Sequence, residues 1–245
     1  HSVHGGGLDS AAMGQYFNFF EKVSDKIVVW NNNKQKPDIY ANLSPTLPTI
    51  KLKNPEIGRD CSIIFYEVSK YILRITRGMS YNQYVDFFNE FIQFVNGLNP
   101  EIKSKIKFRT KHPKPNTKFS YNCEEKFSEM FGEKYIDKIS LKNPVEKTML
   151  NSRLVINTFP ETTFSQAMHS NFPTILISKK DHFIFSKEGS HTFDDLKKNK
   201  IAFEDFNEAK THINKYWKEL DLWWQSTNVQ HARKRYLTNF FNVKS

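Results

Sequence analysis

Short apolar runs alternate with longer segments of helical periodicity along most of the chain. Four short runs are rich in apolar residues and are bounded by polar residues, which is typical of strands buried on both faces. The expected strands are residues 62–66, 106–109, 153–158 and 173–177. The expected helices between and around them are residues 81–98, 124–131, 145–150 and 161–169. Buried strands separated by helices predict an α/β fold, with a Rossmann-like, doubly wound parallel sheet.

The two ends of the chain have different patterns. Residues 10–25 show helical spacing and lead into an expected strand at residues 26–30, whereas prolines mark residues 31–58 as a loop-rich connection with one short strand near its end. The last part of the chain predicts three helices, over residues 192–198, 204–224 and 229–241. We therefore expect an interdomain segment over residues 1–58. Residues 59–245 are expected to form the Rossmann-like domain, with the terminal helices packed on it.

The charge of the chain favours phosphate-rich partners. The 245 residues include 36 Lys and Arg against 26 Asp and Glu, a formal net charge of +10. The run from Lys103 to Lys118 is basic and contains no acidic residue, although a solvated charged edge would also produce such a run. No apolar stretch is long enough for a membrane-spanning helix. The isolated cysteines, Cys61 and Cys123, have no zinc-ligand spacing, so we expect no metal site and a reducing cytoplasm.

Two segments that follow expected strands carry candidate phosphate-binding residues, and ligands of open parallel sheets bind beyond the carboxyl ends of the strands. Near the end of the second strand lie three basic residues, Arg109, Lys111 and His112. The helix after the third strand opens with Glu161, Thr162 and Thr163. Unpaired N–H groups and the helix dipole favour an anion at such a helix start. We expect the two segments to form a single phosphate site together. Each segment also has a simpler interpretation: Glu161 or Thr162 would merely cap the helix, and the basic residues would lie on a charged surface.

A histidine followed by three glycines lies close to the start of the chain. Glycine allows the backbone to approach a ligand closely, so Gly5 and Gly6 are candidate donor contacts, and His4 is a candidate proton acceptor. A mobile terminus would explain the same residues. The pattern also occurs in the oxyanion holes of esterases. Those enzymes need a G-x-S-x-G elbow, and residues 78–82 lack its closing glycine, so we exclude a serine hydrolase.

The order of several motifs resembles that of a bacterial family of surface-carbohydrate transferases found in O-antigen-type gene clusters. His4 to Gly7 followed by residues 24–30 resembles its Q-H-G-G-G…(S/A)-D-x-x-x-x-W pattern, and residues 152–164 with 171–175 resemble its S-R-L-V…T-T-x-L-E…P-T segment. Residues 214–233 resemble its closing helices. That family in turn resembles GT-B glycosyltransferases, including capsule-type Kdo transferases and the CDP-glycerol glycerophosphotransferases.

The resemblance implies roles for individual residues. In CDP-glycerol glycerophosphotransferases a His-Gly motif supplies the catalytic histidine, which matches His4 here. A His-Pro motif after a strand and a hydroxyl pair opening a helix hold the donor pyrophosphate, which matches His112, Thr162 and Thr163. Arg109 matches a basic residue ahead of the His-Pro element. The chain would correspond to the C-terminal, donor-binding half of a GT-B fold, and it is expected to bind donor without turning it over where the N-terminal, acceptor-binding domain is missing.

The predicted function is therefore donor binding in a metal-independent glycosyltransferase of bacterial surface polysaccharide biosynthesis. The expected donor is a nucleotide-activated sugar or polyol phosphate, CMP- or CDP-linked, and no cofactor is expected. The expected location is cytoplasmic, with peripheral contact at the inner membrane face. Two alternatives remain, a basic nucleic-acid-binding module and a catalytically inactive scaffold. The aromatic residues lie on apolar helical stripes rather than among the basic run, which argues against nucleic acid as the partner.

Overall fold

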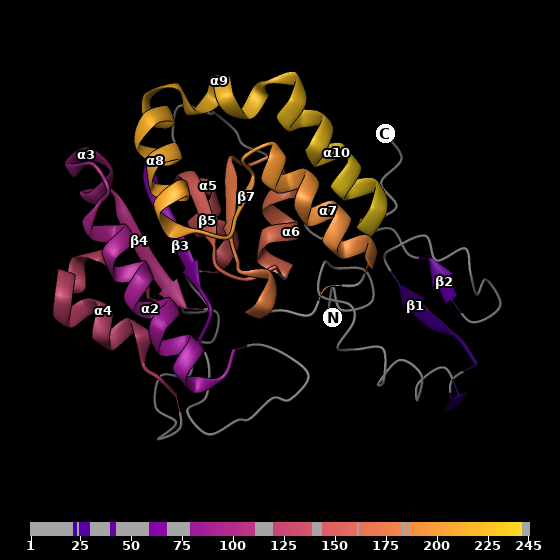
Figure 1. The fold of residues 1–245 in the computed structure, drawn as a ribbon, viewed down its shortest axis with the longest axis horizontal. Coiled ribbons are helices and arrows are strands. Elements are labelled where there is room, and N and C mark those ends of the chain that lie inside the picture. Colours follow the sequence, from indigo (N-terminus) through magenta and orange to yellow (C-terminus); the bar gives the residue numbers. More distant parts are fainter. Residues whose placement is uncertain are drawn as a thin grey trace.

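A parallel sheet of five strands forms the centre of the computed structural model (Figure 1). The structure describes residues 22–23, 25–29, 40–42, 59–67, 79–110, 120–138, 144–160, 162–182, 185 and 187–241. The strands are β3 (Asp60–Phe65), β4 (Ile106–Thr110), β5 (Ser152–Asn157), β6 (Thr174–Ile177) and β7 (Ala202–Phe203). All neighbouring strands are parallel, in the order β4-β3-β5-β6-β7. The expectation of a Rossmann-like, doubly wound α/β fold is confirmed.

The order of the strands reverses once. From β3 the chain first adds β4 on one side, and it then adds β5, β6 and β7 on the other side. The reversal separates the connections that leave β3 and β5, so that a crevice can form beyond the carboxyl ends of these two strands. In open α/β sheets such a switch point is where ligands bind.

One face of the sheet is covered by aromatic packing. Phe65 of β3 and Phe108 of β4 are fully buried on this face. Phe65 packs against Phe91 with ring centroids 4.6 Å apart, and Phe108 stacks on Phe127 at 4.2 Å. The covering helices are α2 (Tyr81–Asn96), α4 (Cys123–Phe131) and α8 (Phe206–Tyr216). Because aromatic pairs contribute beyond the area that they bury, this face holds much of the domain's packing energy.

The other face is covered by helices from later in the chain. Ser165 and Tyr236, buried side chains of α6 and α10, share a hydrogen bond of 2.7 Å. The helices on this side are α5 (Val145–Asn151), α6 (Thr162–His169), α7 (Lys187–Lys198) and α10 (Thr227–Phe241). Figure 1 shows α7 and α10 running side by side. The sheet is thus covered on both faces, which explains why most of its strands are rich in apolar residues.

Several elements differ from the expectation. The helix expected over residues 204–224 is divided by a 3-10 turn, Trp217–Glu219, into α8 and α9 (Leu220–Gln225). The apolar stripe continues across this turn, so the periodicity does not reveal the break. The short elements β7 and α3 (Pro100–Lys103) were not predicted, because two to four residues are too few to show a period. Helix α7 also begins earlier than expected.

A second, two-stranded parallel sheet precedes the main one in the chain. It pairs β1 (Ile27–Val29) with β2 (Tyr40–Asn42). The strand expected at residues 26–30 is therefore present, whereas β2 lies where a loop was expected. Most of the helix expected over residues 10–25 lies outside the described residues. Within the described part of the chain, no helix has the length and apolar character needed to cross a membrane.

Candidate functional site

The carboxyl ends of β4 and β5 lie at the same edge of the sheet. Ile64 of β3 is in register with Arg109 on one side and with Asn157 on the other. Only β3 separates the two strands, so their ends are about 10 Å apart, two strand spacings. The two segments that the sequence singled out therefore leave the sheet at one edge, on either side of β3.

A buried polar contact joins β3 and β5 at this switch point. The Thr158 hydroxyl oxygen accepts a hydrogen bond of 2.9 Å from the Tyr66 amide, and the Thr158 amide donates to the Ile64 carbonyl oxygen. Asn157, fully buried, donates from Nδ2 to the Thr174 hydroxyl oxygen at 3.2 Å. Its Oδ1 atom has no partner among the described residues. These contacts fix the path along which the chain leaves β5 toward α6.

Helix α6 begins at this edge. Thr162 and Thr163 form its first turn and are partly exposed, whereas the side chains from Phe164 to Met168 are buried. A helix start carries N–H groups without intrahelical partners together with the positive end of the helix dipole. The first turn of α6 thus provides a partly exposed anion-binding geometry next to the end of β5.

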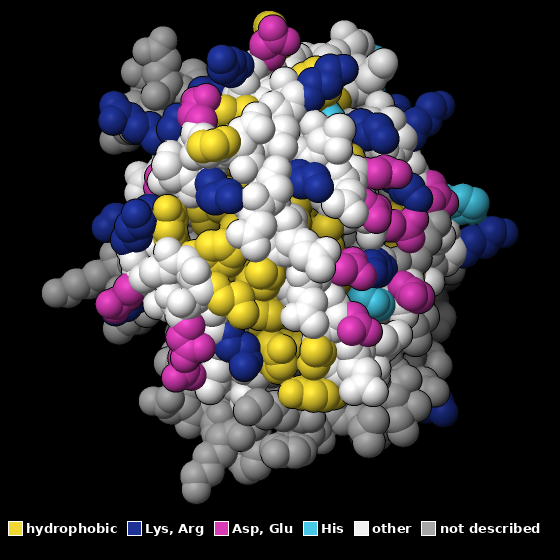
Figure 2. Space-filling view, turned by 60° about the vertical axis from the view of Figure 1, so that its left-hand side comes forward, with side chains coloured by type: hydrophobic (Ala, Val, Ile, Leu, Met, Phe, Trp, Pro, Cys, Tyr) yellow, Lys and Arg dark blue, Asp and Glu magenta, His cyan; other side chains and the backbone are white. Residues whose placement is uncertain are grey.

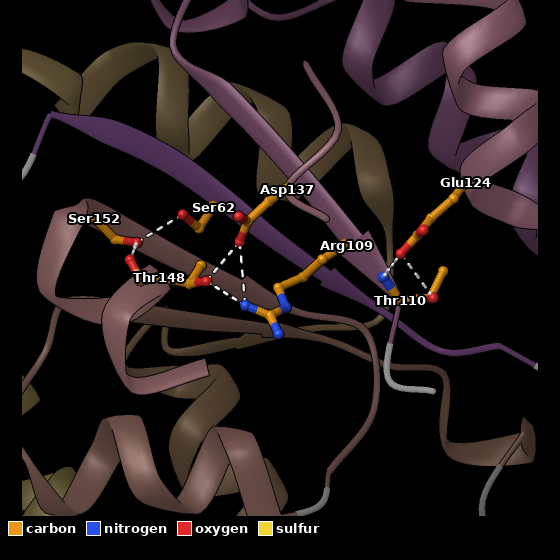
Figure 3. A network of polar contacts seen from close by, with 7 residues as sticks. All are labelled: Ser62, Arg109, Thr110, Glu124, Asp137, Thr148 and Ser152. Carbon is orange, nitrogen blue, oxygen red and sulfur yellow. Dashed lines mark hydrogen bonds and ion pairs between the residues drawn. The ribbon is translucent and has the colours of Figure 1, made fainter. Parts of the chain in front are cut away.

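Helix α4 also begins near this edge, but a carboxylate occupies its start. Glu67, which follows β3, accepts hydrogen bonds of 3.0 Å from the amides of Asn122 and Cys123. Burial raises the pKa of Glu67, and these hydrogen bonds oppose the rise. Glu124, in the first turn of α4, accepts from the amide and the hydroxyl of Thr110 at the end of β4 (Figure 3). The start of α4 is therefore closed to an anionic ligand.

The Arg109 side chain lies in a buried network instead of facing the space beyond the carboxyl ends of the strands (Figure 3). Its side chain is 4% exposed, and Nη1 donates to Asp137 Oδ2 at 3.2 Å and to the Thr148 hydroxyl oxygen. Thr148 in turn donates to Asp137 Oδ2. The sequence predicted Arg109 as a phosphate ligand, but strand alternation turns the side chain onto the face where it meets Thr148 of α5. In the structure, the guanidinium joins β4 to α5.

Two serines extend this network across the sheet. Ser152 Oγ lies 2.6 Å from Ser62 Oγ and 2.6 Å from the Thr148 carbonyl oxygen. Ser62, Thr148 and Ser152 are buried, and these hydrogen bonds give their polar groups partners. Sequence reasoning missed Asp137, Thr148 and the serines, because nothing in their spacing along the chain indicates that they meet.

The remaining predicted site residues lie outside the described residues. They are His4, Gly5, Gly6, Lys111, His112 and Glu161. Their roles stay predictions, as does the division of the chain at residue 58. Within the described residues, no group of three His, Cys, Asp or Glu side chains could hold a metal ion. Burial raises the pKa of the Cys61 thiol to about 12 and also holds the pKa of the Cys123 thiol well above its ordinary value, so neither is a reactive thiolate at neutral pH.

The surface charges are mixed on the side of α2 and α4. Figure 2 shows Lys and Arg interspersed with Asp and Glu on this face, around a group of hydrophobic side chains. Several of the basic groups are paired, as in the contact of 2.6 Å between Lys179 and Glu90 of α2. The described residues of this face form no continuous basic stripe of the kind that tracks a nucleic-acid backbone.

The fold and the strand-end groups define the class of protein, a Rossmann-like α/β domain with a polar switch point. The chain belongs to the LIC12162 family of transferases, whose family model matches residues 1–245. A search of curated proteins found no match. Among solved structures, the chain is similar to the crystal structure of WaaG, a glycosyltransferase involved in lipopolysaccharide biosynthesis, with 12% identity and a TM-score of 0.41. The match covers 94% of this chain and 64% of the WaaG chain, so the chain spans less than two thirds of that structure.

Proposed function

We propose that this transferase-family chain is the donor-binding part of a GT-B-type glycosyltransferase, and that the donor binds between the end of β4 and the start of α6. The observation that carries the proposal is the register of the sheet, in which β4 and β5 end at one edge on either side of β3. Because the start of α4 is occupied by Glu67, the first turn of α6 is the better anion site at this edge. The donor class that fits is a nucleotide-linked sugar or polyol phosphate.

Transfer from such a donor releases a nucleotide, and negative charge develops on its phosphates. Backbone N–H groups at Thr162 and Thr163 and the basic side chains of Lys111 and His112 would stabilise this charge without a bound metal ion. Basic groups and a helix start then take the place of a cation. Arg109 contributes indirectly, by holding β4 against α5.

The remaining parts of the proposal concern the acceptor and the setting. His4 would remove a proton from the acceptor hydroxyl as the new bond forms, and the backbone at Gly5 and Gly6 would lie close to the donor. Acceptor binding is assigned to a separate domain, as in the two-domain GT-B arrangement. The proposed setting is the cytoplasmic face of the inner membrane, where surface polysaccharides are built.

The proposal predicts a nucleotide affinity that depends on His112. We expect the 245-residue chain to bind CMP, CDP or UDP saturably in isothermal titration, and His112→Ala to weaken that binding about tenfold through loss of a charge-assisted hydrogen bond. His231→Ala is the matched control, because His231 is exposed on α10, two residues from Arg233, which contacts the carbonyl oxygens of Met168 and His169 at the C-terminal end of α6. Absence of binding by all three nucleotides, or equal affinities for the two variants, would overturn the proposal.

A further inference from the structure

Helix α6, whose first turn is the proposed place of the donor phosphates, is supported by the last helices of the chain. It has eight residues, and helices of this length are marginal without tertiary contacts. The Tyr236 ring of α10 packs edge-on against Phe164 with ring centroids 5.4 Å apart, and the Tyr236 hydroxyl shares a hydrogen bond of 2.7 Å with Ser165. Both contacts lie within one turn of the start of α6. The position of its first turn therefore depends on α10.

The carboxyl end of α6 is closed by a Schellman motif. The Phe172 amide donates to the Ala167 carbonyl oxygen at 3.0 Å, and the Asn171 amide donates to the Met168 carbonyl oxygen at 3.3 Å. Asn171 has a φ of +58°, the left-handed conformation that this motif requires. Its side-chain oxygen accepts a hydrogen bond of 3.0 Å from Nε1 of Trp224 in α9. The helix thus ends at a defined residue that is tied to α9.

A guanidinium from α10 completes this end of the helix. Arg233 Nε donates to the Met168 carbonyl oxygen at 2.6 Å, and Nη2 donates to the His169 carbonyl oxygen at 3.1 Å. The side chain is half-buried, and burial lowers its pKa, with no opposing carboxylate among the described residues. The positive charge is instead balanced by the negative end of the α6 dipole, a placement that stabilises a helix.

A cation at the carboxyl end of α6 favours an anion at its other end. Both charges stabilise the same helix, the first by its fixed place in the fold and the second when a ligand binds. A helix that is already ordered and fixed binds a ligand more tightly than one that must be ordered on binding. Arg233 can therefore assist binding at the first turn of α6 from the far end of the helix, about 10 Å away.

We propose that Arg233 is a positioning residue for the donor. It keeps α6 ordered and in place, so that the amides of Thr162 and Thr163 meet the donor phosphates without rearrangement. The inference rests on the proposed function and deepens it, because it assigns the placement of the donor helix to α10. Arg233 acts through α6 and does not itself contact the donor.

A second arginine on the same helix provides a matched control. Arg235 donates from Nε and Nη2 to the carboxylate of Asp195 in α7, at 2.9 and 2.7 Å. Arg233→Met and Arg235→Met remove the same group from α10, but only the first removes a contact with α6. Arg233→Lys is the conservative variant, because it keeps a cation near the carboxyl end of α6.

Isothermal titration with CDP, at a temperature where all variants are folded, tests this role. We expect Arg233→Met to bind CDP about tenfold more weakly than the unmodified chain, Arg233→Lys to recover most of the affinity, and Arg235→Met to bind normally. Equal affinities for Arg233→Met and the unmodified chain, or an equal loss in Arg235→Met, would overturn the positioning role and leave the donor proposal intact. An unmodified chain that binds no nucleotide would overturn the donor proposal, and the positioning role with it.

Amide hydrogen exchange without ligand separates positioning from a general loss of stability. In Arg233→Met we expect the amides of α6 to exchange about tenfold faster, whereas those of α2 and β3 keep their rates. In Arg235→Met the amides of α6 should exchange as in the unmodified chain. Arg233→Gln, which is neutral but can still donate, replaces Arg233→Met if the latter does not fold, and the same order is expected. Faster exchange over the whole domain, or unchanged rates in α6, would contradict the role of Arg233.

Discussion

Replacing Asp137 by alanine is expected to lower the free energy of unfolding by about 3–5 kcal/mol. The change removes the carboxylate that faces the buried guanidinium of Arg109 at 3.2 Å and that accepts from the Thr148 hydroxyl. A buried charge that loses its partner keeps its full desolvation cost, which is why the effect is large. Urea denaturation at neutral pH measures it directly.

Two further variants separate this charge effect from a simple loss of packing. Arg109→Met combined with Asp137→Leu removes both charges, and we expect it to recover most of the lost stability. Glu133→Ala breaks the ion pair with Lys138, in which both side chains are more than 70% exposed, and it should change stability little. An Asp137→Ala variant as stable as Glu133→Ala would show that the network of Figure 3 does not hold β4 to α5.

Acidification is expected to destabilise the protein through His212. Its pKa is lowered from 6.5 to about 4, first by burial and then by Lys200 and Lys215. As the pH falls below 6.5 the unfolded chain takes up a proton that the folded protein does not accept until about pH 4, so stability decreases across this window. The contribution is on the order of 3 kcal/mol near pH 4. Burial also lowers the pKa values of His169 and His182, which act in the same direction.

The variant His212→Phe isolates this contribution. It keeps an aromatic ring in the same place but cannot titrate, so its stability should depend less steeply on pH between about 4 and 6.5. His231→Ala, which changes an exposed histidine, should keep the pH dependence of the unmodified chain. Identical pH profiles for His212→Phe and the unmodified chain, measured by urea denaturation, would contradict the assignment.

The sequence predicted the strands of the sheet well, because burial on both faces produced short runs rich in apolar residues. β3, β4, β5 and β6 all lie within a residue or two of their expected positions. It did not predict β7, whose two residues carry no period, although this strand forms one side of the sheet. Strand order also lay beyond the sequence, because it depends on which helix covers which face.

Side-chain roles were harder to predict than elements. Arg109 was assigned to the sheet edge from its place near the end of a strand, but the alternation within the strand decides its direction, and it meets Asp137, 28 residues later. The aromatic residues on the helical stripes of the terminal helices include three tryptophans, and Trp217, Trp223 and Trp224 are all buried in the core. The indole N–H groups of Trp217 and Trp224 have hydrogen-bond partners, whereas that of Trp223 has none among the described residues. Only coordinates distinguish the three.

The central claim is that the start of α6 and the segment after β4 receive the phosphates of the donor. Amide NMR spectra of the chain, recorded while CDP is added, test it most directly. The account predicts that the largest chemical-shift changes occur at the amides of Thr162 and Thr163 and just beyond Thr110, with little change in α8 and α9. Shifts confined to α8 and α9, or an α6 whose amides do not respond at saturating CDP, would contradict it.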